Sequence, residues 1–162
     1  RKLNEQRLKD LGVPGETAKR LFLNSAMTLS YETRLIAALH AVKLPGAADR
    51  VAAAADSRHE REALFHVESA ELLQAQHAKT PLAALLTDSL ATVAVTTGGK
   101  ALVLLPLDWV RWTAAAESTL REIDDRARKE LKATSVGIML TGKTSATAAK
   151  ELAARRWTVA RP

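Results

Sequence analysis

The 162-residue chain contains no cysteine. It therefore has no thiol nucleophile, no disulfide and no cysteine ligand for zinc. The lack of cysteine does not identify the compartment, because cytoplasmic and periplasmic proteins both occur without it. The chain begins with Arg1 rather than methionine, and no signal-peptide core follows. We expect a processed or truncated form without its upstream segment, and both compartments stay open.

Aromatic residues and long apolar runs are also scarce. Aromatics make up 4% of the chain, whereas hydrophobic residues reach 47%, much of it alanine. Such a composition favours closely packed helices over a core of large rings. The longest apolar run, residues 101–107, is interrupted by Pro106 and falls far short of the ~18 residues that span a bilayer. We therefore expect a single domain, residues 1–162, without a membrane span.

The formal net charge is +6, and its distribution matters more than its sum. Basic and acidic residues alternate over residues 121–126, which is typical of a solvated helix surface with internal ion pairs. Aromatic side chains that stack on nucleic-acid bases are few. Nucleic-acid binding is therefore a weak alternative that would use the basic residues near the two ends, which are Arg1, Lys2, Arg7, Lys9, Arg155, Arg156 and Arg161.

Residues 1–88 have the patterns of a helical region. Apolar residues recur at helical spacing over 1–11, 30–42 (with Ser30 as N-cap), 47–55 and 58–78. The last of these is apolar on two sides, which predicts a central helix contacted from both directions. Residues 16–28 fit either a helix or an ordered loop. Thr80-Pro81 predicts one more short helical turn.

Residues 89–162 alternate between strand and helix patterns. Two β-rich runs, 91–97 and 100–105, are joined by Gly98-Gly99, which predicts a hairpin. Asp108 is the expected N-cap of a long helix with an apolar stripe to Leu131, followed by a strand at 136–141, a helix capped at 144 or 145, and a strand at 157–160. The order β-β-α-β-α-β predicts three parallel strands and one antiparallel neighbour. We therefore predict an α+β or small α/β fold, with the helical half packed on a mixed four-stranded sheet.

Residues 137–144 match the phosphate-loop pattern G-x-x-x-x-G-K-[ST]. In a phosphate loop the strand precedes the first glycine, but here residues 138–141 are the apolar strand themselves. Glu151 is the only acidic residue after Thr144, so no later strand supplies a carboxylate for magnesium. We interpret the match as chance and expect no bound nucleotide. A weaker hypothesis is a site for one phosphate or carboxylate at Gly142, Lys143 and Thr144, before a helix N-terminus.

A polar group stands on the helix predicted at 58–78. His59, Glu62 and His66 lie on one side of an ideal helix, but their spacing matches no zinc-protease motif. We therefore predict structural histidines and no metal site.

Glu68 is the fourth member of this polar group, and leucine and alanine residues surround it on its helical face. A partly buried carboxylate needs a partner, and we expect Arg34 or Arg50 to pair with it.

No nucleophile–base pair, metal set or cofactor loop remains in the sequence. We therefore favour a non-enzymatic binding or assembly module without a cofactor, whose partner is another protein or a second copy. The alanine- and arginine-rich composition favours a bacterial source. An enzyme that uses Glu68 and His66 as acid and base, and the weak nucleic-acid binder, remain as alternatives.

Overall fold

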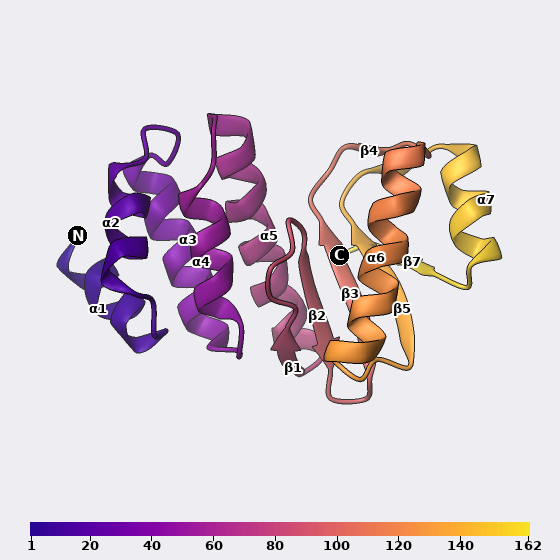
Figure 1. Cartoon of the computed structure of the whole chain (residues 1–162), viewed down its shortest axis with the longest axis horizontal. Coiled ribbons are helices and arrows are strands. Elements are labelled where there is room, and N and C mark those ends of the chain that lie inside the picture. The colour runs from indigo at the N-terminus through magenta and orange to yellow at the C-terminus, as the bar shows by residue number, and fades with distance from the viewer.

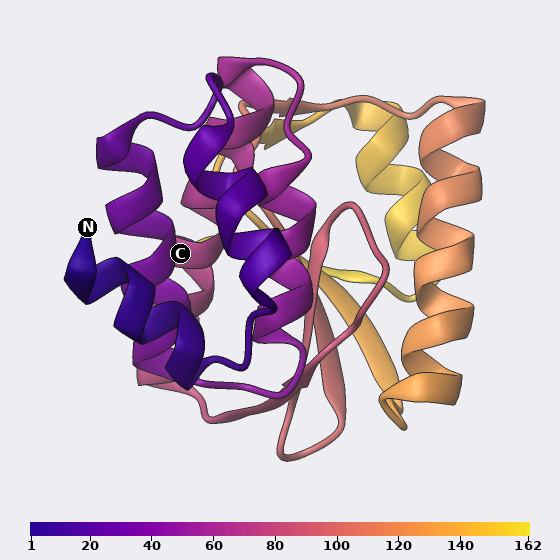
Figure 2. The same ribbon diagram turned by 60° about the vertical axis from the view of Figure 1, so that its left-hand side comes forward.

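The computed structural model describes residues 1–162 and has three layers (Figures 1 and 2). A mixed sheet lies in the middle, the helices of the N-terminal half cover one face, and two helices of the C-terminal half lie on the other. The predicted α+β class, with a helical N-terminal half packed on a mixed sheet, is confirmed. None of the helices is both long and apolar enough to cross a membrane.

The first layer consists of five helices. Thr28, rather than Ser30, caps the third of them, because its side chain accepts a hydrogen bond from the backbone N–H of Tyr31. The fifth packs against the third and fourth helices and also against the sheet, as its two apolar sides predict. The helices are α1 (Lys2–Asp10), α2 (Gly15–Leu23), α3 (Leu29–Val42), α4 (Ala47–Ala55) and α5 (Glu60–Lys79).

The sheet has the order β1-β2-β3-β5-β7. β1 pairs with β2 and β2 with β3 in antiparallel fashion, whereas β3, β5 and β7 are parallel. These directions confirm the predicted hairpin and crossovers. The strands are β1 (Leu82–Leu85), β2 (Thr92–Thr96), β3 (Lys100–Leu105), β5 (Ser135–Leu140) and β7 (Thr158–Ala160).

The fifth strand, β1, replaces the helical turn predicted after Thr80-Pro81. A Leu-Ala-Ala-Leu segment has little preference of its own for a strand. It is extended because it pairs with the edge of β2, and because the backbone N–H of Leu85 donates to the carbonyl oxygen of Pro45 at 2.9 Å. Both partners are distant in sequence, so the local pattern does not reveal them.

The long C-terminal helix, α6 (Ala114–Glu130), begins later than predicted. Thr113, rather than Asp108, is its N-cap and accepts a hydrogen bond from the N–H of Ala116 at 3.0 Å. Residues that we assigned to its first turn form β4 (Trp109–Val110), which pairs in parallel with β6 (Lys143–Thr144). That pairing joins segments more than 30 residues apart, which local periodicity cannot detect.

Each face of the sheet has its own core. Ala94, Leu102 and Leu104 face the α1–α5 layer. Val93, Val103 and Ile138 face α6 and α7 (Ala146–Ala154). Because β3 and β5 are buried on both faces, they form the centre of the sheet, and their carboxyl ends meet at one edge.

Candidate functional site

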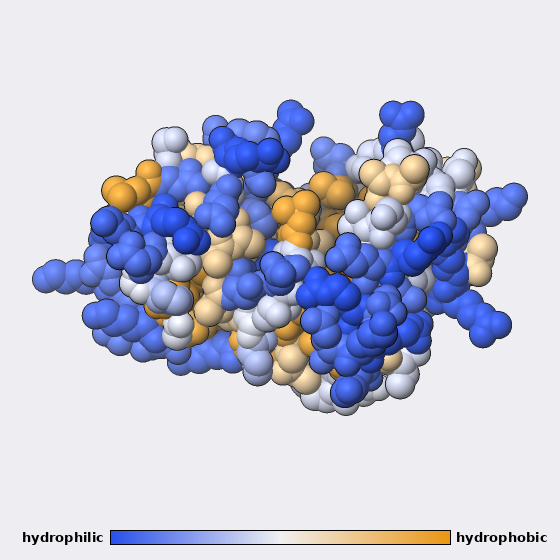
Figure 3. All heavy atoms as spheres, in the orientation of Figure 1, coloured by the Kyte–Doolittle hydropathy of each residue, from blue (hydrophilic) through white to orange (hydrophobic).

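A cleft lies at the carboxyl end of β3, between the segment that follows this strand and α5. In the space-filling view the surface is hollowed between the α1–α5 layer and the α6–α7 layer, and hydrophobic residues are exposed there (Figure 3). The cleft has a volume of about 470 Å³. In sheets of parallel strands, ligands characteristically bind at the carboxyl ends. Its lining consists of Arg61, Leu64, Phe65 and Glu68 from α5 and Pro106, Leu107 and Asp108 from the opposite wall.

The helical wall of the cleft follows from the periodicity of α5. Residues 61, 64, 65 and 68 recur at helical spacing and share one face. Ala63 and Val67, on the opposite face, are fully buried. The start of the helix is fixed by a reciprocal cap, in which the N–H of Glu62 donates to His59 Nδ1 at 3.3 Å and the N–H of Arg58 donates to Glu62 Oε2 at 2.9 Å.

The second wall, residues 106–108, is held against the segment that follows β5. The backbone N–H of Lys143 donates to the carbonyl oxygen of Asp108 at 2.8 Å, and the N–H of Thr141 to that of Leu105 at 3.3 Å. A Cβ atom at position 142 would overlap the carbonyl oxygens of Leu107 and Asp108. Glycine at 142 therefore permits the close contact that positions this wall.

Three charged side chains line the cleft, and none of them has an ion-pair or hydrogen-bond partner within the chain. They are Arg61, Glu68 and Asp108. Arg34, which we expected to pair with Glu68, forms a two-bond pair with Glu71, both bonds at 2.8 Å. Besides the hydrogen bonds to Glu71, the nearby charge of Glu68 also raises the pKa of this guanidinium, without a direct ion pair. Glu68 remains half-buried in the cleft wall, available to a ligand.

Arg50, the other expected partner of Glu68, is buried in α4 and forms no ion pair. Its guanidinium donates to the carbonyl oxygens of Ser89 at 2.6 Å, Leu90 at 3.0 Å and Ala91 at 3.1 Å. It therefore anchors the loop between β1 and β2 to the helical layer. Burial lowers the pKa of this guanidinium from its usual value.

The structure does not bring the four residues of the predicted polar group together. His59 and Glu62 cap α5, whereas Glu68 lines the cleft. His66 lies two residues from Glu68, on another face, and is 4% exposed. No group of three or more histidine, aspartate or glutamate side chains is arranged to hold a metal ion. The acid and base of the enzyme alternative are thus on different faces of α5.

His66 lacks a hydrogen-bond partner at Nε2, as do Arg50 at Nε and Ser69 at Oγ. Burial, reinforced by the positive charge of Arg50 and partly opposed by Glu62, lowers the pKa of His66 to about 4. The imidazole is therefore neutral in the folded protein at neutral pH.

The titration of His66 gives a pH dependence of stability. Between pH 6.5, its ordinary pKa, and about 4, the unfolded chain binds a proton that the folded chain does not. The free energy of unfolding is thus expected to fall by up to about 3 kcal/mol from this residue as the pH is lowered through that window. Urea unfolding of the parent and of His66→Gln from pH 7 to 4 measures it. In His66→Gln the free energy of unfolding should depend much less on pH between 7 and 4, whereas the control His59→Asn should show the dependence of the parent. The same pH dependence in all three proteins would contradict the assignment.

The residues of the phosphate-loop match lie in extended, paired backbone. Residues 137–140 belong to β5, which pairs with β3 on one side and β7 on the other. Lys143 and Thr144 form β6, and Gly142 packs on the second wall of the cleft. Ser145 caps α7 and accepts a hydrogen bond from the N–H of Ala148 at 3.1 Å. The backbone of this segment therefore does not curl around an open anion cradle.

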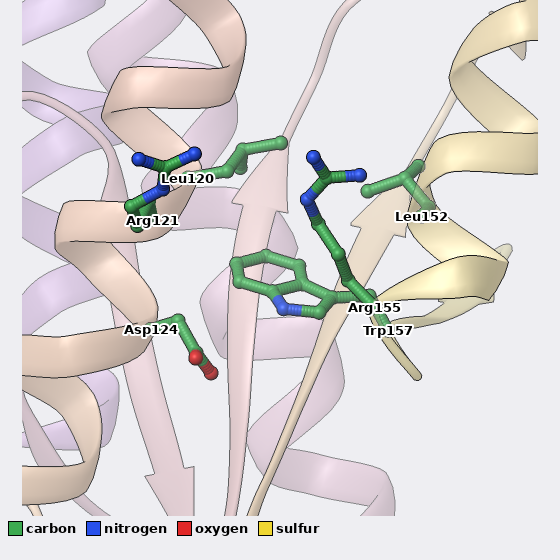
Figure 4. Close-up of a pocket in the computed structure, with 6 residues that line it drawn as sticks. All are labelled: Leu120, Arg121, Asp124, Leu152, Arg155 and Trp157. Atoms are coloured by element: carbon green, nitrogen blue, oxygen red, sulfur yellow. The ribbon is translucent and has the colours of Figure 1, made fainter.

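A second groove, of about 290 Å³, separates α6 from α7 (Figure 4). The indole of Trp157 lies between the two helices. Arg155 extends beside it but is already paired with Glu151 at 2.6 Å and Glu117 at 3.0 Å. Because these charges are satisfied within the chain, this groove is a weaker candidate than the cleft.

Comparisons with known proteins identify no relative: no family model matches the chain, and no curated protein or solved structure is significantly similar to it. An assignment of function therefore rests on the geometry of the chain itself. Of the cleft residues, sequence analysis identified only Glu68. The spacing of residues 61, 64, 65 and 68 was a signal for the helical wall, whereas nothing local indicated that residues 106–108 would lie across from it.

Proposed function

We propose that the protein is a non-enzymatic binding module whose cleft between α5 and residues 106–108 receives a segment of a partner protein. One observation carries this proposal: a preformed cleft combines apolar side chains with three charged groups that have no partner in the chain. Protein interfaces combine an apolar centre with polar groups that pair across the contact.

The charges on α6 make a useful contrast. There, acidic and basic residues pair along the helix, so that few charges remain for a partner. The pairs are Arg121 with Glu117, Arg126 with Glu130, Arg128 with Asp124 and Lys129 with Asp125. The cleft therefore differs from α6 in combining unpaired charges with apolar side chains in one concave surface.

Two further observations favour binding of a protein over the alternatives. No hydroxyl, imidazole or amine lines the cleft, so the two carboxylates are its only groups for nucleophilic or acid–base chemistry, and no histidine stands beside them. The basic residues near the chain ends belong to α1 and follow α7, which lie at opposite ends of the long axis (Figure 1). They do not form one continuous surface for a nucleic acid.

The test needs no assumption about the identity of the partner. Peptides enriched from a random display library on the immobilised protein should compete for one site, and Leu107→Lys should weaken their binding at least tenfold. Leu107 is 37% exposed in the cleft wall, so the new charge meets solvent rather than the core.

Leu23→Lys is the matched control. Leu23 is 73% exposed at the end of α2, and its replacement adds the same charge outside the cleft. The selected peptides should bind this variant as they bind the parent. Failure to enrich any peptide, or equal binding to Leu107→Lys, would refute the cleft as the binding site.

A further inference from the structure

The cleft has a charge opposite to that of the whole protein. Its two carboxylates and one guanidinium give a local charge of −1, whereas the chain as a whole carries +6. Long-range attraction by the protein therefore favours acidic partners, but the cleft itself favours a basic group. A cleft whose charge is opposite in sign to the net charge of the protein selects its occupant by charge as well as by shape.

The carboxylates come from both walls. Glu68 projects from α5 and Asp108 from the segment after β3, and neither pairs with Arg61 or with any other cation of the chain. Arg61 and Glu68 are seven residues apart on one helix, which corresponds to about 10.5 Å along its axis. The two side chains form no ion pair with each other, so each can contact a different part of one ligand.

The apolar lining provides the rest of the site. Phe65 stands one helical turn before Glu68 on the same face, and Leu64, Leu107 and Pro106 add aliphatic surface. A carboxylate beside an aromatic ring suits the head of a lysine or arginine side chain, because the ring face also attracts cations. The aliphatic surface suits leucine-like neighbours of that basic residue.

On the basis of the proposed function, we propose that the occupant of the cleft is a peptide segment that presents lysine or arginine next to an apolar residue, with its cationic group directed to Glu68 and Asp108. Arg61 then repels the cation and confines it to the acidic part of the cleft.

The experiment uses two capped pentapeptides that differ only in charge, Leu-Lys-Phe-Lys-Leu and Leu-Glu-Phe-Glu-Leu. Each is titrated into the ¹⁵N-labelled protein and followed by NMR. The basic peptide should shift the amide resonances of residues 61–68 and 106–108 and the indole resonance of Trp109, which is 55% exposed next to Asp108. The acidic peptide should bind at least tenfold more weakly.

Charge variants distinguish the cleft from general attraction. The double variant Glu68→Gln with Asp108→Asn should weaken binding of the basic peptide at least tenfold. Its control, Glu16→Gln with Glu122→Gln, removes two exposed, unpaired carboxylates elsewhere and should leave binding within twofold. Arg61→Gln removes the like charge and should strengthen binding about two- to threefold.

Equal weakening by both double variants would overturn the proposal, as would the absence of binding by the basic peptide. Tighter binding of the acidic peptide in the cleft would overturn the charge preference but leave the cleft as a binding site. The Leu107→Lys experiment tests the cleft with peptides of any charge, so its failure is a separate result.

Discussion

Replacing Gly142 with alanine is expected to lower the free energy of unfolding by about 3 kcal/mol or more, at or above the upper end of the usual range for overpacking, because the atoms in the way cannot move aside. A methyl group at this position would overlap the carbonyl oxygens of Leu107 and Asp108. These are backbone atoms, held by the hydrogen bond from the N–H of Lys143. Relief therefore requires the wall of the cleft to separate from the segment after β5. Urea unfolding measures the loss.

Gly98→Ala is the matched control for this prediction. A Cβ at position 98 would come no closer than 3.8 Å to its nearest neighbour, the side-chain oxygen of Thr96, so the free energy of unfolding should change little. NMR of Gly142→Ala should also show altered amide resonances at Trp109 and Val110, where β4 pairs with β6. Wild-type stability together with unchanged β4 resonances would contradict the close contact.

Replacing Arg50 with alanine is expected to lower the free energy of unfolding by about 3–5 kcal/mol. The side chain is 2% exposed and supplies the hydrogen bonds to three successive carbonyl groups of residues 89–91. Its removal leaves a cavity between α4 and the loop between β1 and β2, and deprives those carbonyls of their donor. Urea unfolding measures the total loss, and hydrogen exchange should show faster opening of residues 86–91.

Arg50→Met separates the two contributions. Methionine fills much of the same space but donates no hydrogen bond, and it also removes a buried charge that has no carboxylate partner. The free energy of unfolding should therefore fall less in Arg50→Met than in Arg50→Ala, by about 1–3 kcal/mol. A methionine variant as stable as the parent would mean that the three hydrogen bonds contribute no net stability, and would contradict the role assigned to Arg50.

Local periodicity was sufficient to predict the helices that bury one continuous stripe of apolar side chains. The stripe of Leu120, Ile123 and Ala127 in α6 is buried, and the alanine-rich helix at 47–55 was predicted at its observed bounds. Such patterns are repeated within a single segment, so they can be read from that segment alone.

The conformation of the short segments depends instead on contacts with residues distant in the sequence. β1, β4 and β6 contain two to four residues, and each is extended because a distant strand pairs with it. The same reason explains the errors at Thr80-Pro81 and Asp108, where good local capping signals were present but tertiary pairing prevailed.

The sequence by itself determined the class of the fold, the directions of β2, β3, β5 and β7 and the extended state of residues 136–140, because hydrophobic period and turn chemistry are local properties. Only the tertiary structure determined which residues form the cleft. Its walls come from segments about 40 residues apart, and the freedom of Arg61, Glu68 and Asp108 from internal partners depends on where every other charged side chain lies. Charge pairing is a property of the folded arrangement, so a linear pattern cannot reveal which charges remain available to a partner.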